Sequence, residues 1–205
     1  MENIIQATKL TKIYGEKETS VTALDNVDVQ FNENEFTAIM GPSGSGKSTL
    51  LHCLAGLDRP TSGQIFLKDQ DISTLNDKQL TKIRRDSFGF VFQAFNLIPT
   101  LTAEENITLP ASISGKKPDM DWINQVVETV DIGDRLTHRP NELSGGQQQR
   151  VAAARAMATK PEVIFADEPS GNLDSKSSKE LLTFMKSVVE AVSYTHLTLP
   201  TMIRV

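Results

Sequence analysis

The 205-residue sequence predicts an α/β fold, and three observations carry that prediction. Two apolar runs, residues 36–40 (FTAIM) and 163–166 (VIFA), are typical of strands covered on both faces of a parallel sheet. A glycine-rich loop and a helical stretch directly follow the first run, over residues 41–57. Residues 95–158 carry helical rather than strand periodicity. Strand, loop, helix, helical insertion and strand is the order of an α/β domain.

Shorter patterns supply the remaining elements. Residues 27–31 (VDVQF) alternate apolar and polar side chains, which predicts a half-buried strand. Thr102 and Glu105 have the spacing of a capping box, so a helix is expected to begin there. The other expected elements are strands that open at 4–7 and span 64–67 and 88–92, and helices over 76–85 (capped by Asn76), 123–130 and 181–189.

Composition is that of a globular protein and excludes several classes. Hydrophobic residues make up 39% and charged residues 23%, which suffices for a sizeable core. The formal net charge of −5 argues against a partner held by phosphate neutralisation, so we expect no nucleic-acid partner. The single cysteine, Cys53, rules out an internal disulfide and fits a reducing compartment. The sequence has no apolar run of membrane-spanning length and no secretory signal, which favours a cytoplasmic protein.

A phosphate-binding loop is the most specific motif. Its residues fit G-x-x-x-x-G-K-[ST]: Gly41, Pro42, Ser43, Gly44, Ser45, Gly46, Lys47 and Ser48. The glycines let backbone N–H groups close around phosphate oxygens. Lys47 supplies a positive charge for the β- and γ-phosphates, and Ser48 a hydroxyl for Mg²⁺. A chance Gly/Ser loop is the alternative, and the buried strand before it and the helix after it argue against that alternative.

Two carboxylates end the second apolar run. Asp167 is placed to hold Mg²⁺ beside the phosphate loop, and Glu168 to position or deprotonate water. Two acids at the end of an apolar strand are costly unless a cation or hydrogen bonds compensate them. A solvated Asp-Glu-Pro turn is the alternative interpretation, which the phosphate loop disfavours.

A second helix start is suited to an anion. Ser144 and Gln147 have capping-box spacing, and Gly145 and Gly146 between them leave backbone N–H groups bare. A simply well-capped helix is the alternative. Because the phosphate loop already serves one nucleotide, this helix start is suited to a nucleotide held by another chain.

These motifs, in this order, resemble those of ABC ATPases over about residues 3–190. Residues 143–147 (LSGGQ) are similar to the family's signature motif. Tyr14 resembles the aromatic residue that stacks on adenine, and Gln93 the Q-loop glutamine that joins Mg²⁺ and relays to the membrane partner. Asp174, in residues 170–174 (SGNLD), resembles the D-loop aspartate.

The resemblance implies a P-loop NTPase with a RecA-like core, a small antiparallel β lobe and a helical lobe at about 95–158. Two copies would clamp two ATP molecules head to tail, with Ser144, Gly145, Gly146 and Gln147 completing the partner's site. It implies ATP and Mg²⁺ as cofactors, Lys47, Gln93 and Glu168 as catalytic residues, and Thr49 as a further ATP-binding residue. Closure would drive an integral-membrane permease from the cytoplasmic face of the membrane.

The Q-loop string and residues 168–174 (EPSGNLD) most resemble the branch of macrolide exporters, lipoprotein-release ATPases and antimicrobial-peptide exporters. This branch predicts an exporter or a lipoprotein- or peptide-extruding type. A regulatory clamp on a membrane protein, as in the cell-division members, is an alternative. A DNA-repair ATPase is a weaker one, because the chain between Lys47 and Ser144 has neither heptads nor cysteine clusters.

The C-terminal segment departs from the family pattern. The family's switch histidine follows the D-loop helix on a further strand, and the preceding residues of His196 do not suggest such a strand. We therefore assign no switch histidine. Residues 194–205 show no helical or strand pattern and are expected to be a non-native tail on a domain of residues 1–193 that is incomplete at its C-terminus. Weak ATP hydrolysis is the expected consequence. A divergent but genuine ending is the alternative.

Other residues with chemical potential are assigned structural roles. His52 and His138 lack a metal-ligating partner at useful spacing, and both are expected to be structural or solvated. Trp122 is expected to pack on a helix face, and Cys53 to be a small core residue.

Overall fold

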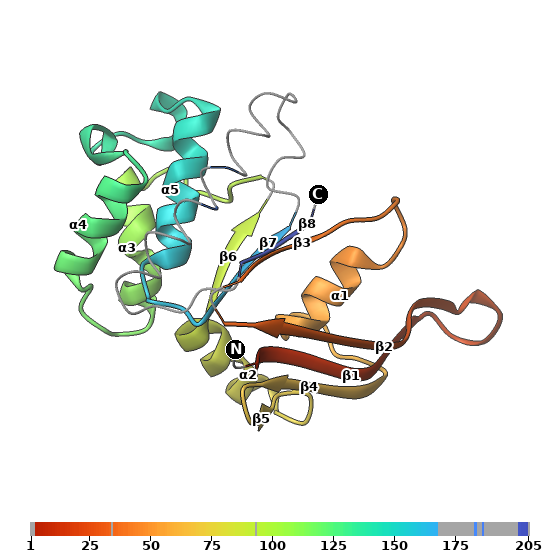
Figure 1. Ribbon diagram of the computed structural model, residues 1–205. Coiled ribbons are helices and arrows are strands. Elements are labelled where there is room, and N and C mark those ends of the chain that lie inside the picture. The colour runs from red at the N-terminus through yellow and green to blue at the C-terminus, as the bar shows by residue number, and fades with distance from the viewer. Residues whose placement is uncertain are drawn as a thin grey trace.

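The computed structural model describes residues 3–33, 35–92, 94–167, 183, 186 and 201–204. Within them the chain forms two four-stranded sheets and five α-helices (Figure 1). One sheet is antiparallel in the order β2-β1-β4-β5, and the other is parallel in the order β3-β8-β7-β6.

The antiparallel sheet is built mainly from the N-terminal residues. Its strands are β1 (Asn3–Tyr14), β2 (Val21–Asn32), β4 (Ser62–Leu67) and β5 (Gln70–Asp71). β1 and β2 pair from Asn3–Asn32 to Tyr14–Val21, and a 3₁₀ turn, η1 (Lys17–Thr19), lies between them. The alternation expected for residues 27–31 is confirmed, with Phe31 buried and Asp28 and Gln30 exposed.

Candidate site residues lie at the ends of two strands of the parallel sheet: the phosphate loop follows β3, and Asp167 ends β7. Its strands are β3 (Phe36–Ile39), β6 (Phe88–Phe92), β7 (Val163–Asp167) and β8 (Thr201–Arg204). β7 is buried from Val163 to Ala166, as expected. The same expectation is wrong for β3, whose residues are half-buried or exposed. The reason is packing: β3 and β6 are both outermost strands of the described parallel sheet, but α2 and α5 pack against β6, whereas β3 packs mainly against β8.

β8 corrects a second expectation. The C-terminal segment was expected to contribute no strand, yet residues 201–204 pair in parallel with both β3 and β7. A strand at this position satisfies backbone groups that β3 and β7 would otherwise leave unpaired. The interpretation of residues 194–205 as a non-native tail stays a prediction.

The helices begin where the capping signals lie. They are α1 (Lys47–Leu54), α2 (Asp77–Ser87), α3 (Ala103–Ile113), α4 (Met120–Thr129) and α5 (Gly145–Met157), with 3₁₀ turns η2 (Gly133–Arg135) and η3 (Pro140–Glu142). Capping boxes are present at Asn76, Thr102 and Ser144. These caps satisfy backbone N–H groups that have no partner inside the helix.

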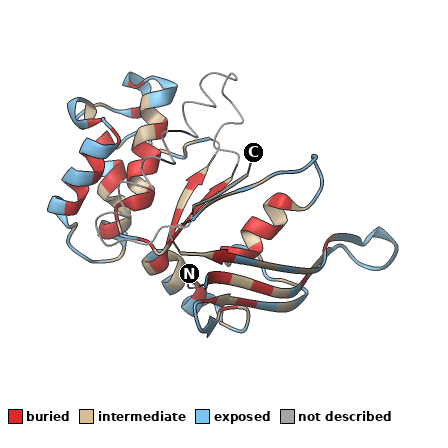
Figure 2. Ribbon diagram, in the orientation of Figure 1, coloured by how far each residue is buried: buried red, intermediate tan, exposed pale blue. Residues whose placement is uncertain are grey.

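Two hydrophobic clusters lie on opposite sides of the parallel sheet (Figure 2). Ile164 and Ala166 of β7 belong to the cluster of the helical lobe, with α3, α4 and α5. Val163 and Phe165 belong to the other, with α1 and the antiparallel sheet. Because strand side chains alternate between faces, β7 joins both clusters. The phosphate-loop helix α1 and the signature helix α5 therefore lie on opposite faces of this sheet (Figure 1).

Candidate nucleotide site

The phosphate loop connects β3 to α1 and packs against β2. Gly46 has φ +85°, and a Cβ at this position would collide with the backbone carbonyl oxygen of Ala23. Gly44 also has a left-handed backbone (φ +79°), but no atom lies within 4 Å of where its Cβ would be. Gly46 is therefore required by both conformation and close packing, whereas Gly44 needs only conformational freedom. This backbone fits a phosphate cradle at the start of a helix.

Lys47 places its ammonium group inside this loop. Its Nζ donates to the carbonyl oxygens of Gly41 (2.5 Å) and Pro42 (2.7 Å), with the Ser45 hydroxyl at 3.4 Å. The residue is only 8% exposed. A lysine is rarely buried unless its charge is compensated. The loop thus holds a positive charge where the glycine motif predicts the phosphates.

Asp167 lies beside the same helix. β7 ends at Asp167, whose Oδ2 is 3.5 Å from Nε2 of His52 on α1. His52 is four residues after Ser48, so the two share one face of the helix. A carboxylate and a hydroxyl are oxygen ligands, and Mg²⁺ in nucleotide sites takes one or two carboxylates together with substrate phosphates. Ser48 and Asp167 fit that requirement. The contact of His52 with Asp167 was not predicted from the sequence. The four-residue spacing of His52 from Ser48 could have indicated that both side chains lie on the same face of α1.

Tyr14 ends β1 within a small polar cluster. Its hydroxyl donates to Oδ2 of Asp58 (2.6 Å), and Lys12 Nζ donates to Oδ1 of the same carboxylate (2.7 Å). Lys12 Nζ also lies 4.7 Å from the centre of the Tyr14 ring. Thr49, in the first turn of α1, lies within hydrogen-bonding reach of the Tyr14 hydroxyl. The structure thus brings Tyr14 and Thr49 together at the start of α1, with Lys12 and Asp58 as residues that sequence reasoning missed.

The ionisation of this cluster follows from its contacts. Burial and the hydrogen bond to Asp58 raise the pKa of the Tyr14 phenol above 10.0, so it stays a donor. Burial alone would raise the pKa of Asp58. The hydrogen bonds from Lys12 and Tyr14 outweigh it and hold that pKa below 3.8. In this cluster the protonated Tyr14 phenol and the Lys12 ammonium group therefore both donate hydrogen bonds to the ionised Asp58 carboxylate.

The signature residues form an exposed helix start on the other lobe. Ser144 Oγ accepts from the Gln147 N–H (3.3 Å), and Gln147 Oε1 accepts from the Ser144 N–H (2.9 Å). Gly145 and Gly146 are exposed, and no atom lies within 4 Å of where a Cβ would be. The predicted capping box is confirmed, and its helix, α5, lies on the opposite side of the parallel sheet from the phosphate-loop helix α1 (Figure 1).

The remaining expected site residues, Gln93, Glu168 and Asp174, lie outside the described residues, as does His196, to which no site role was assigned. β6 and β7 end at the same level, with Phe92 paired to Asp167.

Just after Gln93, Phe95 (φ +56°) and Asn96 (φ +48°) have left-handed backbones. Their carbonyl oxygens accept from Arg155 at 2.7 and 2.6 Å. Burial lowers the pKa of Arg155, which nevertheless stays charged at neutral pH. No local sequence pattern predicts this anchor.

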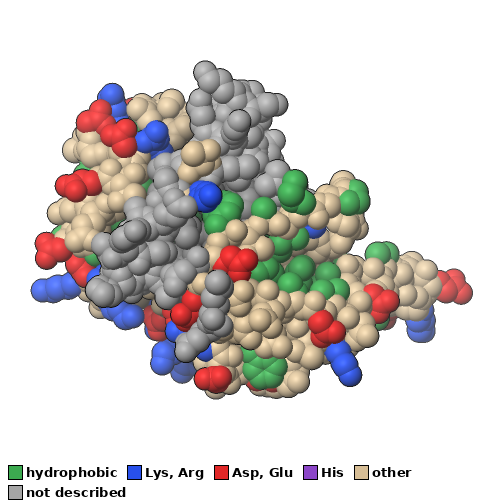
Figure 3. Space-filling model, in the orientation of Figure 1, with side chains coloured by type: hydrophobic (Ala, Val, Ile, Leu, Met, Phe, Trp, Pro, Cys, Tyr) green, Lys and Arg blue, Asp and Glu red, His purple; other side chains and the backbone are tan. Residues whose placement is uncertain are grey.

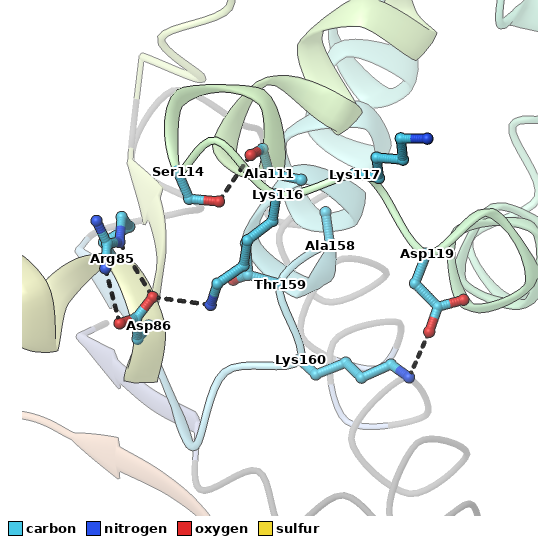
Figure 4. Close-up of a pocket in the computed structure, with 10 residues that line it drawn as sticks. All are labelled: Arg85, Asp86, Ala111, Ser114, Lys116, Lys117, Asp119, Ala158, Thr159 and Lys160. Atoms are coloured by element: carbon cyan, nitrogen blue, oxygen red, sulfur yellow. Dashed lines mark hydrogen bonds and ion pairs between the residues drawn. The ribbon is translucent and has the colours of Figure 1, made fainter.

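A separate cavity of about 130 Å³ lies where α2, the end of α3 and the end of α5 meet (Figure 4). Asp86 accepts from Arg85 (2.9 Å) and from Lys116 (3.1 Å), and Asp119 accepts from Lys160 (2.8 Å). Of these pairs, only Lys116–Asp86 joins the helical lobe to α2. The lining carries more positive than negative side chains: Arg85, Lys116, Lys117 and Lys160 against Asp86 and Asp119. On the face shown in Figure 3, acidic and basic side chains of the described residues are interspersed.

The comparisons with known proteins decide the family. A family model described as ABC transporter matches residues 24–171. The chain belongs to the ABC transporter family. It is 47% identical over 192 residues to an ABC transporter ATP-binding protein of Thermotoga maritima, covering 93% of this chain and 82% of the relative. It is 46% identical over 184 residues to the macrolide export ATP-binding/permease protein MacB of Marinobacter nauticus, covering 89% of this chain and 29% of MacB.

Solved structures agree with this assignment. The chain resembles the dimeric structure of MJ0796, a bacterial ABC transporter cassette, with a TM-score of 0.81 and 42% identity over 98% of this chain and 87% of that one. A second structure of MJ0796, a dimeric post-hydrolysis state bound to ADP and Pi, has the same TM-score at 40% identity. The predicted P-loop NTPase fold and ABC ATPase class are confirmed. Among the described residues, no helix is both long and apolar enough to cross a membrane.

Proposed function

We propose that this chain powers an export-type ABC transporter through ATP-driven closure of a homodimer. The observation that carries the proposal is that the two halves of a nucleotide site lie on opposite sides of the parallel sheet. The phosphate loop and Asp167 lie on the α1 side of the parallel sheet, and the capped start of α5 lies on the other lobe. Because α1 and α5 of one chain lie on opposite sides of the parallel sheet, we assign the completion of each site to two chains arranged head to tail.

The start of α5 has the properties that such an arrangement requires. The capping box engages the N–H groups of Ser144 and Gln147 and leaves those of Gly145 and Gly146 to an outside acceptor. A γ-phosphate from the partner is a suitable acceptor at the positive end of this helix. The dimeric structures of the similar cassette MJ0796 support this pairing.

The chemistry assigned to the chain's own residues is ATP hydrolysis. Lys47 leaves its carbonyl partners to donate to β- and γ-phosphate oxygens, and Ser48, Asp167 and Gln93 hold Mg²⁺. Mg²⁺, when bound, neutralises charge on these oxygens. Glu168 orients a water and accepts its proton as the water oxygen bonds to the γ-phosphorus and the bond to the β–γ bridging oxygen breaks. Asp174 is assigned to the dimer interface between the two sites.

The permease is assigned to a separate or continuing polypeptide. MacB-type relatives are named ATP-binding/permease proteins, and this chain spans about 29% of their length. We place the chain against such a permease at the cytoplasmic face of the membrane. Segment 94–101, anchored by Arg155, follows the glutamine assigned to this relay.

A nucleotide-trapped dimer tests the proposal. Glu168→Gln keeps ATP binding but removes the proton acceptor, so we expect a dimer by size-exclusion chromatography with light scattering in saturating Mg-ATP. Without nucleotide we expect a monomer. Lys47→Ala is the matched control and should neither bind ATP nor dimerise. A Glu168→Gln protein that binds ATP by calorimetry yet stays monomeric contradicts the proposed mechanism.

A further inference from the structure

The carboxylate of Asp58 connects two parts of the nucleotide site. It accepts hydrogen bonds from the Tyr14 hydroxyl (2.6 Å) and from Lys12 Nζ (2.7 Å), both on β1. The Asp58 backbone N–H donates to the carbonyl of His52 in the last turn of α1 (3.2 Å). Gly56, with φ +62°, turns the chain between that helix and Asp58. One residue thus links the ring of Tyr14 to the helix that starts with Lys47.

We propose that Asp58 is a positioning residue that fixes the Tyr14 ring for stacking on the nucleotide base. This inference rests on the proposed role of Tyr14 as the base platform. Asp58 itself does not need to touch the nucleotide. It sets the ring's orientation relative to α1, and so the spacing between the base platform and the phosphate cradle.

Lys12 decides which face of the ring receives the base. Its Nζ lies 4.7 Å from the ring centre and also donates to the carbonyl oxygen of Arg59 (2.7 Å). With its side chain only 13% exposed, Lys12 is held on that face by two acceptors. The base therefore stacks on the opposite face. A cation on one face also draws π-electron density towards it, which favours an electron-rich purine on the other.

A purely structural role is the competing explanation, in which the cluster only clips β1 to the loop after α1. The two explanations differ in what the Asp58 carboxylate should affect. If the cluster only supports the fold, losing the carboxylate should weaken the binding of every ligand of the phosphate loop to the same extent. A positioning residue for the ring affects ligands that carry a base and spares those that do not.

The test compares ATP with tripolyphosphate, which has the phosphates but no base. Base–aromatic stacking contributes about 1–3 kcal/mol, so Tyr14→Ala should weaken ATP binding by about fivefold to 150-fold. Asp58→Ala should weaken it about fivefold, and Asp58→Asn less, because an amide oxygen can still accept from the phenol. Neither Asp58 variant should change tripolyphosphate affinity more than about twofold. Asp58→Ala should add nothing in the Tyr14→Ala background.

A spectroscopic readout keeps the test independent of affinity. The chain has two tyrosines, Tyr14 and Tyr194, so ¹³C labelling at the tyrosine Cζ gives one signal for each ring, and Tyr14→Phe assigns the Tyr14 signal. ATP should shift the Tyr14 signal in the wild type. In Asp58→Ala the unliganded signal should move to the position of a free phenol. Asp77→Asn is the matched control. Asp77 pairs with Arg59, the residue after Asp58, at 2.8 Å, and it does not pair with Tyr14. This variant should leave the Tyr14 signal unchanged.

Each result has a defined meaning. Equal losses of ATP and tripolyphosphate affinity in Asp58→Ala, or unchanged affinity for both, overturn the positioning role while ATP binding by the wild type keeps the proposed function. Additive losses in the Tyr14→Ala, Asp58→Ala double variant overturn it as well. A wild-type protein that binds neither ligand overturns the proposed function and this inference together.

Discussion

Asp167 and His52 face each other across the junction of β7 and α1, with 3.5 Å between the carboxylate oxygen Oδ2 and the imidazole Nε2. One helical turn before His52, on the same side of α1, lies Ser48. The contact therefore aligns the end of the buried strand with the helix that begins at the phosphate loop. It is the geometric basis for assigning Asp167 and Ser48 to one metal site.

Asp167→Asn should remove the advantage that Mg²⁺ gives to ATP binding. An amide is a weaker magnesium ligand than a carboxylate and carries no charge. We expect affinity in Mg-ATP to fall by about tenfold, or ~1.4 kcal/mol, towards the value measured in EDTA. Isothermal titration calorimetry with and without Mg²⁺ measures this. The exposed Asp121→Asn is the control, and an Asp167→Asn protein with undiminished magnesium dependence contradicts the assignment.

Gly46→Ala should cost far more nucleotide affinity than Gly44→Ala. Both positions have a left-handed backbone, so each alanine costs about 1 kcal/mol in strain. At Gly46 the new methyl also collides with the Ala23 carbonyl, whereas the space at Gly44 is open. We expect ATP affinity to fall at least tenfold more in Gly46→Ala. Similar affinities for the two variants would show that the close approach to β2 does not shape the loop.

Local signals explain what the sequence predicted well. β6 has its expected bounds, and the helix caps at Asn76, Thr102 and Ser144 are present, because each depends on residues a few positions apart. The phosphate loop is similarly encoded by consecutive residues. The family followed from the order of such motifs along the chain.

Contacts between distant segments could not be predicted in this way. Asp58 meets Tyr14 across 44 residues, and Arg155 meets Phe95 across 60, so neither pair leaves a spacing pattern in the sequence. The half-burial of β3 depends on which described elements pack against it, which local apolarity does not encode. β8 is four residues long and pairs with strands far away in the sequence. Tertiary packing decides all of these features.

Arg155→Ala should destabilise the protein substantially. The guanidinium holds the carbonyls of Phe95 and Asn96, whose left-handed backbones cost energy without compensation. Leaving the partly buried Phe95 carbonyl without a donor costs about 1–3 kcal/mol, and the exposed Asn96 carbonyl adds less because water can replace the guanidinium. At this chain length we expect a melting temperature lower by roughly 2–10 °C.

The matched controls for Arg155 separate charge from geometry. Arg155→Lys keeps the charge but cannot donate in a fork to both carbonyls, so it should restore only part of the loss. Arg85 pairs with its neighbour Asp86 at the surface, and Arg85→Ala should leave the melting temperature nearly unchanged. Equal melting temperatures for Arg155→Ala and Arg85→Ala would refute the anchoring role.

Cys53 should make the protein less stable at alkaline pH. Burial, followed by the nearby charge of Asp58, raises the pKa of its thiol from 9.0 to about 11. The folded protein thus holds this proton more tightly than the unfolded chain, so stability is unaffected below pH 9 and falls as pH rises from 9 to 11. Between pH 8 and 10 we expect the wild type to lose about 1 kcal/mol more than Cys53→Ser in urea unfolding. Parallel pH profiles for the two proteins would mean that the thiol ionises in the folded state as readily as in the unfolded chain.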